Sequence, residues 1–122
     1  KELTVGKSYL TTASVNYDAV YIAGGKDCAG AIAGQGDAIH FTNEAYKHAK
    51  PIGAAGEGID VLASTQIKGI SIVMSDLGAA SDAGVVMTRN TADLTEFCNE
   101  FLGAVSQHRH WQRENYKDSI PA

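Results

Sequence analysis

Short runs of apolar residues, each closed by glycine, stand out in the first half of the chain. The run at 19–23 ends at Gly24 and Gly25, and the run at 51–55 ends at Gly56. Neither run alternates with polar residues, a pattern typical of parallel strands that are buried on both faces. The pattern therefore predicts two parallel strands, each followed by a tight turn at the same edge of a sheet.

Two other stretches show helical spacing. Residues 36–49 and residues 94–105 carry apolar side chains at steps of three and four, which predicts two amphipathic helices. Asn90 is expected to cap the second helix, with Asp93 in its first turn. Cys98 lies on the apolar stripe of that helix and is predicted to be a buried core thiol.

The remaining segments complete the order of elements. Residues 9–15 are β-branched or small and polar, which predicts a partly exposed strand. Residues 67–74 are expected to form another strand, and residues 81–88 the last one. We interpret residues 1–107 as an α/β domain and residues 108–122, which lack periodicity, as a C-terminal tail that covers a surface.

Strands and helices thus alternate along the chain, which favours a three-layer α/β fold with a parallel sheet. Such folds usually open on a buried strand followed by a helix, whereas the first residues here are polar and charged. We therefore expect that the first β-α-β unit of the sheet is lacking from this chain. A sheet without that unit would expose a long apolar strand edge, which natural proteins avoid.

Composition narrows the possible partners. A net charge of −4 and a pI near 5.4 argue against a nucleic-acid or anionic-membrane partner. Cys28 and Cys98 are too few for a disulfide framework and lack zinc-ligand spacing, so we interpret both as thiols. No apolar run reaches the roughly 18 residues of a membrane span, and either a cytoplasmic or a secreted location fits. Because the chain starts at a lysine, we expect it to be processed or part of a longer protein.

The turn after residue 55 is the expected position of an active site, because ligands and nucleophiles lie at the carboxyl ends of strands in open α/β sheets. This stretch resembles the nucleophile elbow of the class I glutamine-amidotransferase-like superfamily, which includes PfpI-like peptidases. The position of the family's cysteine holds Gly56, followed by Glu57 and Gly58. The resemblance implies that Gly24 and Gly25 supply backbone N–H groups beside this vestigial elbow. The nucleophile itself is missing.

Three other functions can be weighed from the residues: a displaced nucleophile, a phosphate site and a metal site. Cys28 follows the glycine pair and lies near a lysine, so it is a candidate for a displaced nucleophile of a PfpI-like hydrolase. The glycines at 53–58 are a candidate cradle for the phosphate of a nucleotide, although they fit no phosphate-binding motif and Glu57 would repel phosphate. His108 and His110 lack further ligands at metal-binding spacing, so no metal site is predicted.

Several separated motifs carry a sharper resemblance. They are residues 14–25, 36–48, 53–58 and 108–113, in that order. Together they resemble the C-terminal domain of large-subunit haem catalases, and most of all the fungal ones. The resemblance implies a flavodoxin-like domain appended to a haem-containing core, in a homotetramer that converts hydrogen peroxide to water and oxygen.

The same resemblance implies what this chain does and does not carry. The haem and its ligands belong to the catalase core, so no cofactor is expected here and the chain alone is not an enzyme. Its expected role is non-catalytic: assembly and stability, with a chaperone-like role toward client proteins in some members. The expected partners are the catalase core and neighbouring subunits. Trp111, flanked by Arg109 and Arg113, is the candidate docking group, because aromatic and arginine side chains commonly anchor interfaces.

Overall fold

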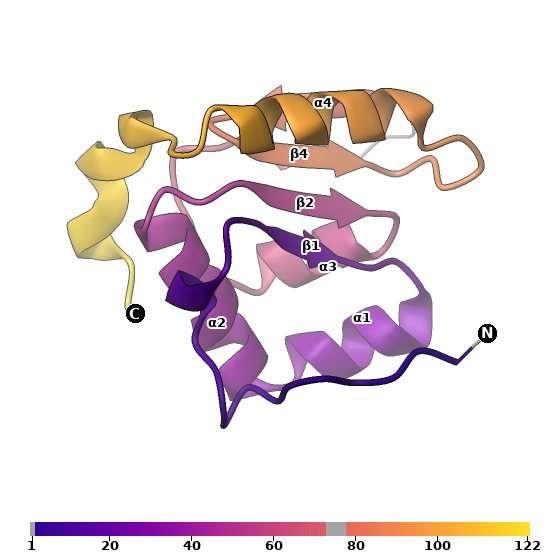
Figure 1. The fold of residues 1–122 in the computed structure, drawn as a ribbon, viewed down its shortest axis with the longest axis horizontal. Helices are drawn as coiled ribbons and strands as arrows, with labels where there is room; N and C mark the ends of the chain where they lie inside the picture. Colours follow the sequence, from indigo (N-terminus) through magenta and orange to yellow (C-terminus); the bar gives the residue numbers. More distant parts are fainter. Residues whose placement is uncertain (1, 73–77) are drawn as a thin grey trace.

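The computed structural model describes residues 2–72 and 78–122. Within these residues the chain forms four strands, four α-helices and two 3-10 helices (Figure 1). In chain order they are η1 (Ser14–Asn16), β1 (Val20–Ile22), α1 (Lys26–Ala33), α2 (Gly36–Lys47), β2 (Ile52–Ala55), α3 (Gly58–Ala63), β3 (Ala79–Asp82), β4 (Val85–Thr88), α4 (Thr95–Ser106) and η2 (Trp111–Ser119).

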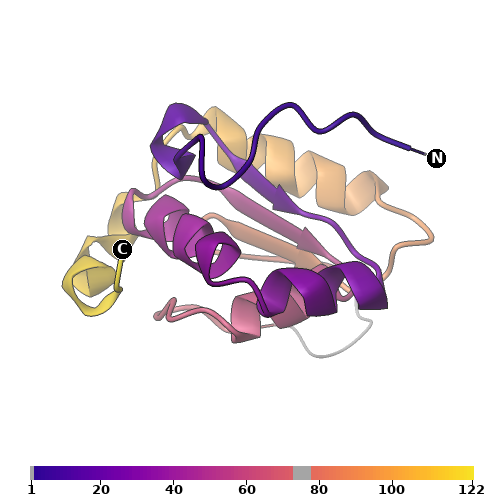
Figure 2. The same cartoon turned by 90° about the horizontal axis from the view of Figure 1, so that it is seen from below.

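The strands form one sheet in the order β1-β2-β4-β3. Strand β2 pairs in parallel with both β1 and β4, whereas β3 pairs antiparallel with β4. Helix α4 covers one face of the sheet, and α1, α2 and α3 cover the other (Figure 1, Figure 2). The predicted three-layer α/β fold is therefore confirmed. No helix among the described residues is both long enough and apolar enough to cross a membrane.

The core has one part on each face of the sheet. On the side of α1 to α3, Tyr46 packs in a cluster that includes Met87 of β4. On the other side, Phe97 of α4 packs with Val86. Gly53 in β2 allows this second contact, because a Cβ there would lie 3.0 Å from the rings of Phe97 and Phe101. The glycine inside the strand thus sets how closely α4 approaches the sheet.

Residues 81–88 were predicted as a single strand, but they fold as part of a hairpin. Strand β3 ends at Asp82 and β4 begins at Val85. The two residues between them, Ala83 and Gly84, have φ values of 49° and 79°. Positive φ at both central residues is the mark of the tight turn that suits the twist of antiparallel strands.

The prediction of a strand at residues 9–15 is wrong, because residues 9–11 form a turn and Ser14 begins η1. Side chains supply the partners that a neighbouring strand would have supplied. The N–H of Ser14 donates to the Glu44 carboxylate at 3.0 Å, and the Lys50 ammonium donates to the carbonyl of Ser14 at 3.0 Å. Backbone groups satisfied in this way need no strand partner.

The predicted strand at residues 67–74 is also wrong where the structure describes it. Residues 67–72 form neither strand nor helix, and residues 73 and 74 lie outside the described residues. Ile67, Ile70 and Ile72 still pack against the core, which explains the apolar pattern. The segment is thus a loop whose isoleucines pack against the core from outside.

Helix α4 begins later than its expected cap. Asn90 accepts a hydrogen bond from the N–H of Ala92 rather than capping the helix, and Asp93 accepts one from the N–H of Thr95 at 3.0 Å. Cys98 is exposed, so the prediction of a buried thiol is wrong. It follows Phe97, which is buried, and one residue turns the helix by about 100°. That turn carries the thiol off the sheet-facing side.

Candidate functional site

The elbow has the backbone of a nucleophile site but no nucleophile. Strand β2 is buried along its whole length, and α3 begins at Gly58. Between them Gly56 has a φ of +56°, a conformation that favours glycine, and its N–H donates to the carbonyl of Thr88 at 2.7 Å. The strand, sharp turn and helix expected from the sequence are therefore present, with a hydrogen atom where the side chain of a nucleophile would stand.

Glycines also bring the loops after β1 and β2 into direct backbone contact. A Cβ on Gly58 would lie 2.6 Å from the carbonyl oxygen of Ile22, and a Cβ on Gly24 would lie 2.9 Å from that of Ala55. Real side chains do not tolerate such distances to backbone atoms. The glycine pair after β1 thus lies close to the backbone at the end of β2.

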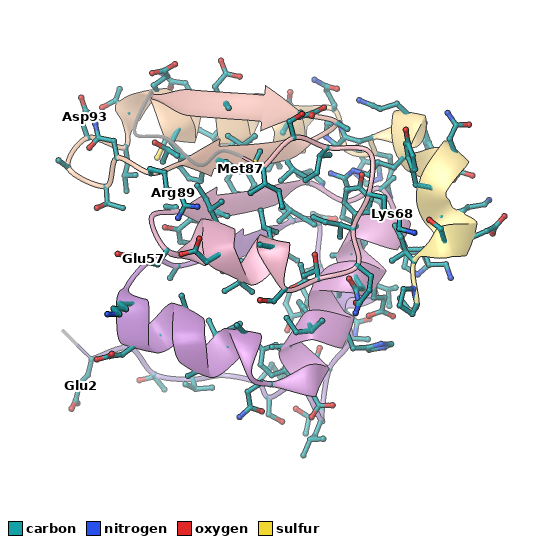
Figure 3. All side chains as sticks on the ribbon, turned by 180° about the vertical axis from the view of Figure 1, so that it is seen from behind. Glu2, Glu57, Lys68, Met87, Arg89 and Asp93 are labelled. Atoms are coloured by element: carbon teal, nitrogen blue, oxygen red, sulfur yellow. The ribbon has the colours of Figure 1, made fainter. Side chains whose placement is uncertain are left out.

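Glu57 holds the backbone donor that this arrangement offers. Its carboxylate accepts a hydrogen bond from the N–H of Gly25 at 2.9 Å. This bond, followed by one from the residue's own N–H, lowers the pKa of the exposed Glu57 carboxyl. Glu57 and Arg89 lie at the same end of the sheet, beside the start of α3 (Figure 3). The carboxylate occupies the place where a bound anion or an oxyanion would meet Gly25.

Arg89 completes this end of the sheet, and the sequence analysis missed it. One of its terminal nitrogens lies 2.9 Å from the Asp60 carboxylate, and the other donates to the carbonyl of Gly56 at 3.3 Å. The side chain is largely covered. Arg89 directly follows β4, and the carboxyl end of a buried strand is the signal that could have identified it.

Cys28 lacks the surroundings of an activated thiol. It is exposed on the first turn of α1, and no hydrogen bond to its thiol occurs among the described residues. The four histidines lie elsewhere: His40 is on α2, His48 follows that helix, and His108 and His110 belong to the tail. A displaced nucleophile needs a base within hydrogen-bonding reach, and the described part of the structure provides none.

The two tail histidines have different surroundings. His108 is exposed, whereas His110 is buried and its Nε2 lies 3.0 Å from the carbonyl oxygen of Ala104. Burial lowers the pKa of His110. Within residues 2–72 and 78–122 no group of three or more His, Cys, Asp or Glu side chains is arranged to hold a metal ion.

Three residues were expected to dock a partner, and the structure separates them. Trp111 is exposed over 65% of its surface, and Arg109 is partly exposed. Arg113 is 1% exposed, so its side chain is not on the surface where a partner would dock. Its guanidinium instead donates to the carbonyls of Ala83 and Lys50, each at 2.6 Å.

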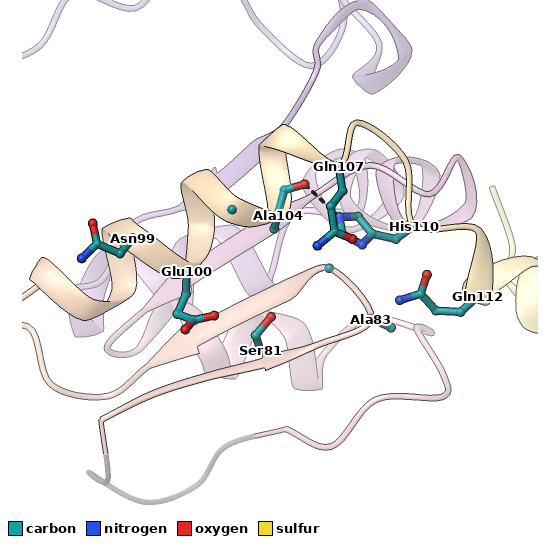
Figure 4. Close-up of a pocket in the computed structure, with 10 residues that line it drawn as sticks. Ser81, Ala83, Asn99, Glu100, Ala104, Gln107, His110 and Gln112 are labelled. Carbon is teal, nitrogen blue, oxygen red and sulfur yellow. Dashed lines mark hydrogen bonds between the residues drawn. The ribbon is translucent and has the colours of Figure 1, made fainter.

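A cavity of about 410 Å³ lies between α4, the β3–β4 hairpin and the tail (Figure 4). Its labelled lining is mainly polar, and includes Ser81, Asn99, Glu100, Gln107 and His110. The imidazole of His110 is turned to the backbone of α4 rather than left available as a ligand. An open polar cavity of this kind fits neither a haem nor another large apolar cofactor.

Comparison with known proteins identifies the family of the chain. A family model described as the C-terminal domain found in long catalases matches residues 2–115. Catalase HPII of Mycobacterium avium is 45% identical over 99% of this chain and 17% of its own length. Catalase-2 of Bacillus subtilis is 39% identical over 93% of this chain and 14% of its own length.

A fungal protein is among the relatives as well. Catalase-1 of Neurospora crassa is 33% identical over 83% of this chain and 15% of its own length. The chain thus spans less than a fifth of each of these proteins. The resemblance seen in the sequence is confirmed by a match that covers nearly the whole chain: it belongs to the family of C-terminal domains found in long catalases.

Proposed function

We propose that this chain is a non-catalytic accessory domain of a larger haem catalase, a protein that converts hydrogen peroxide to water and oxygen. One observation carries the non-catalytic part: Gly56 stands where the superfamily has its nucleophile, and the Glu57 carboxylate occupies the neighbouring Gly25 N–H. Acyl transfer needs both a nucleophile and donors free to bind an oxyanion. Neither requirement is met at this elbow.

The same contact argues against a nucleotide-binding module. A phosphate at the start of α3 would have to displace Glu57 from Gly25 and would meet a negative charge there. The lowered pKa of the carboxyl keeps it ionised at neutral pH. Haem in the parent protein would be held by residues outside this chain. The open polar cavity between α4 and the tail, described above, does not fit it.

The open edge of the sheet supports a role in assembly. Among the described strands, β1 pairs only with β2, so its other edge has no strand partner. Tyr21 on β1 and Leu102 on α4 expose 50% and 64% of their surfaces. We infer that a preceding β-α-β unit of the same polypeptide completes the sheet here, since an uncovered parallel edge is an aggregation hazard. The partners of the completed domain are the catalase core and neighbouring subunits of a homotetramer.

Trp111→Ala in the longer protein is the experiment that tests the docking role. We expect weaker association of the domain with its partner, by about 2 kcal/mol, because truncating a buried aromatic anchor of an interface has that effect. Sedimentation velocity should show dissociation at higher protein concentration, while peroxide turnover per haem stays the same.

Leu10→Ala is the matched control, because Leu10 is an exposed apolar side chain of the N-terminal segment and does not line the cavity that Trp111 lines. It should leave the assembly unchanged. If Trp111→Ala and Leu10→Ala sediment alike, Trp111 is not a docking residue.

A further inference from the structure

The tail and the end of α2 enclose a cavity of about 390 Å³. Its lining comes from segments far apart in the chain and includes Lys47, Lys50, Arg109, Trp111, Glu114 and Lys117. We call this the tail pocket. It lies at the amino ends of the parallel strands, the opposite end of the sheet from the elbow (Figure 1). A ligand of the tail pocket would therefore be independent of the vestigial site.

The charge of the tail pocket is opposite to that of the chain as a whole. Its lining holds four lysine or arginine side chains and one carboxylate, whereas the chain carries a net charge of −4. The single carboxylate, Glu114, is already paired with Lys117 at 2.7 Å. The pocket is thus a local concentration of positive charge on an acidic protein.

Lys50 and Arg109 form no ion pair within the described residues. Lys47 donates to the carbonyl of Ile120 at 3.4 Å and to an oxygen of Ala122, the last residue of the sequence, at 3.3 Å. Arg109 donates to the carbonyl of its neighbour His108 at 3.0 Å. A neutral carbonyl partner satisfies an N–H group but leaves the charge uncompensated. Arg109 therefore faces the pocket with no carboxylate partner among the described residues.

Lys50 adds a third, buried charge behind them. It is 3% exposed, and its ammonium donates to the carbonyls of Ser14, Val15 and Tyr17. Burial, and then the charge of Arg109, lower the pKa of Lys50. The Glu44 carboxylate nearby is engaged by Ser14 rather than by Lys50. A carboxylate that entered the tail pocket would relieve this repulsion.

Trp111 gives the pocket an apolar wall beside the cations, and its indole is 65% exposed. A small phosphate would not use such a wall, and it binds best where several backbone N–H groups converge. The C-terminal end of α2, which lies here, presents carbonyl groups instead. The combination of cations and an aromatic surface suits a peptide that carries both carboxylates and an apolar side chain.

We propose that the tail pocket binds an acidic segment, rich in Asp and Glu, of the longer polypeptide outside residues 1–122. This inference rests on the proposed docking function and names the chemistry of the docked partner. The carboxylates pair with Lys47 and Arg109, and an apolar residue of the segment covers Trp111.

Zero-length carbodiimide cross-linking of the intact longer protein, followed by mass spectrometry, tests this directly. The reagent joins an amine to a carboxylate only when the two are in contact. We expect cross-links from Lys47 to Asp or Glu residues outside residues 1–122. Lys47→Arg should abolish these links but preserve assembly, because arginine keeps the charge and does not react. Reversing two charges, in Lys47→Glu with Arg109→Glu, should weaken docking about tenfold or more and remove much of its salt dependence.

Lys26 is the matched control, since it is an exposed lysine on the far end of the molecule. Lys26→Glu should change neither assembly nor its salt dependence. The inference is overturned if Lys47 forms no link outside this chain, or if the double reversal leaves docking unchanged. If cross-links instead join other lysines of this domain to the core, the domain docks by another face, and the proposed function stands without the tail pocket.

Discussion

Gly58→Ala is expected to destabilise the domain by about 2–3 kcal/mol, the upper range for forcing a methyl group into a packed interior. The added Cβ would lie 2.6 Å from the carbonyl oxygen of Ile22 and 3.0 Å from that of Ala23. Both oxygens are backbone atoms, one in the last residue of β1 and one in the residue that follows. The clash therefore cannot be relieved by the rotation of a side chain. The free energy of unfolding of this domain, from denaturant titration of the longer protein, is the measurement.

Gly30→Ala is the matched control for this substitution. Gly30 lies inside α1, and a Cβ there would meet nothing within 4 Å. Alanine is the better helix former by about 0.8–1 kcal/mol, so the control should raise the stability. Opposite signs for the two variants are therefore expected. A Gly58→Ala domain as stable as the unsubstituted one would show that the loops after β1 and β2 do not touch.

Arg113→Met is expected to cost about 3 kcal/mol or more. The guanidinium makes two hydrogen bonds of 2.6 Å, to the carbonyls of Ala83 and Lys50, and lies 4.4 Å from the centre of the Tyr46 ring. Hydrogen bonds to a charged donor contribute about 1.5–3 kcal/mol each, and the buried carbonyls would stay behind without partners. Thermal unfolding of the longer protein measures the effect.

Burial of the Arg113 guanidinium also has a free-energy cost, which opposes the gain from its hydrogen bonds. Among the described residues its guanidinium has no carboxylate partner and one of its nitrogens has no hydrogen bond, and burial lowers its pKa to about 10. Methionine would remove this desolvation cost. We expect the loss at the carbonyls to be larger, because those groups belong to the backbone and cannot be removed with the side chain. Lys7→Met, at an exposed position, should change the stability by less than about 0.5 kcal/mol. A stabilised Arg113→Met variant would contradict the expected balance.

Sequence patterns predicted the parts of the fold that depend on local burial. Continuous apolar runs predicted β1, β2 and β4. Strands β2 and β4 are buried on both faces as expected, whereas Tyr21 of β1 is half exposed. Helices α2 and α4 were predicted because one face of each is apolar over about three turns. Helix α1 was not predicted, since only one of its eight residues, Ala29, is buried.

The errors share a physical cause, which is dependence on distant partners. Ser14 avoids a strand because Glu44 and Lys50, about thirty residues away, hold its backbone. The segment at 67–72 carries apolar side chains because it packs against the core as a loop. No local pattern distinguishes such segments from strands, because residues of the same type occur in both.

In the site, too, local patterns could be predicted and contacts between distant residues could not. The turn at Gly56 could be predicted from the break in an apolar run, but the bond from Gly25 to Glu57 depends on how two loops meet. The burial of Arg113 was also beyond sequence reasoning. Arginine is almost never fully buried unless paired, and here its carbonyl partners come from the α2 end and the β3–β4 turn.

The most direct test compares the intact longer protein with two variants. One stops before Lys1, and the other, Trp111→Ala, gives a second comparison that does not depend on the folding of a truncated protein. Peroxide turnover per haem and the assembled mass in sedimentation velocity are measured on the same samples. We expect turnover per haem to stay within about twofold, since each tenfold change in rate requires 1.36 kcal/mol at the transition state and an accessory role implies that no group of this domain reaches the reacting atoms. The number of subunits in the assembly should fall. An unchanged number of subunits together with a large loss of turnover per haem, in both variants, would contradict an accessory role and place this domain in the chemistry itself.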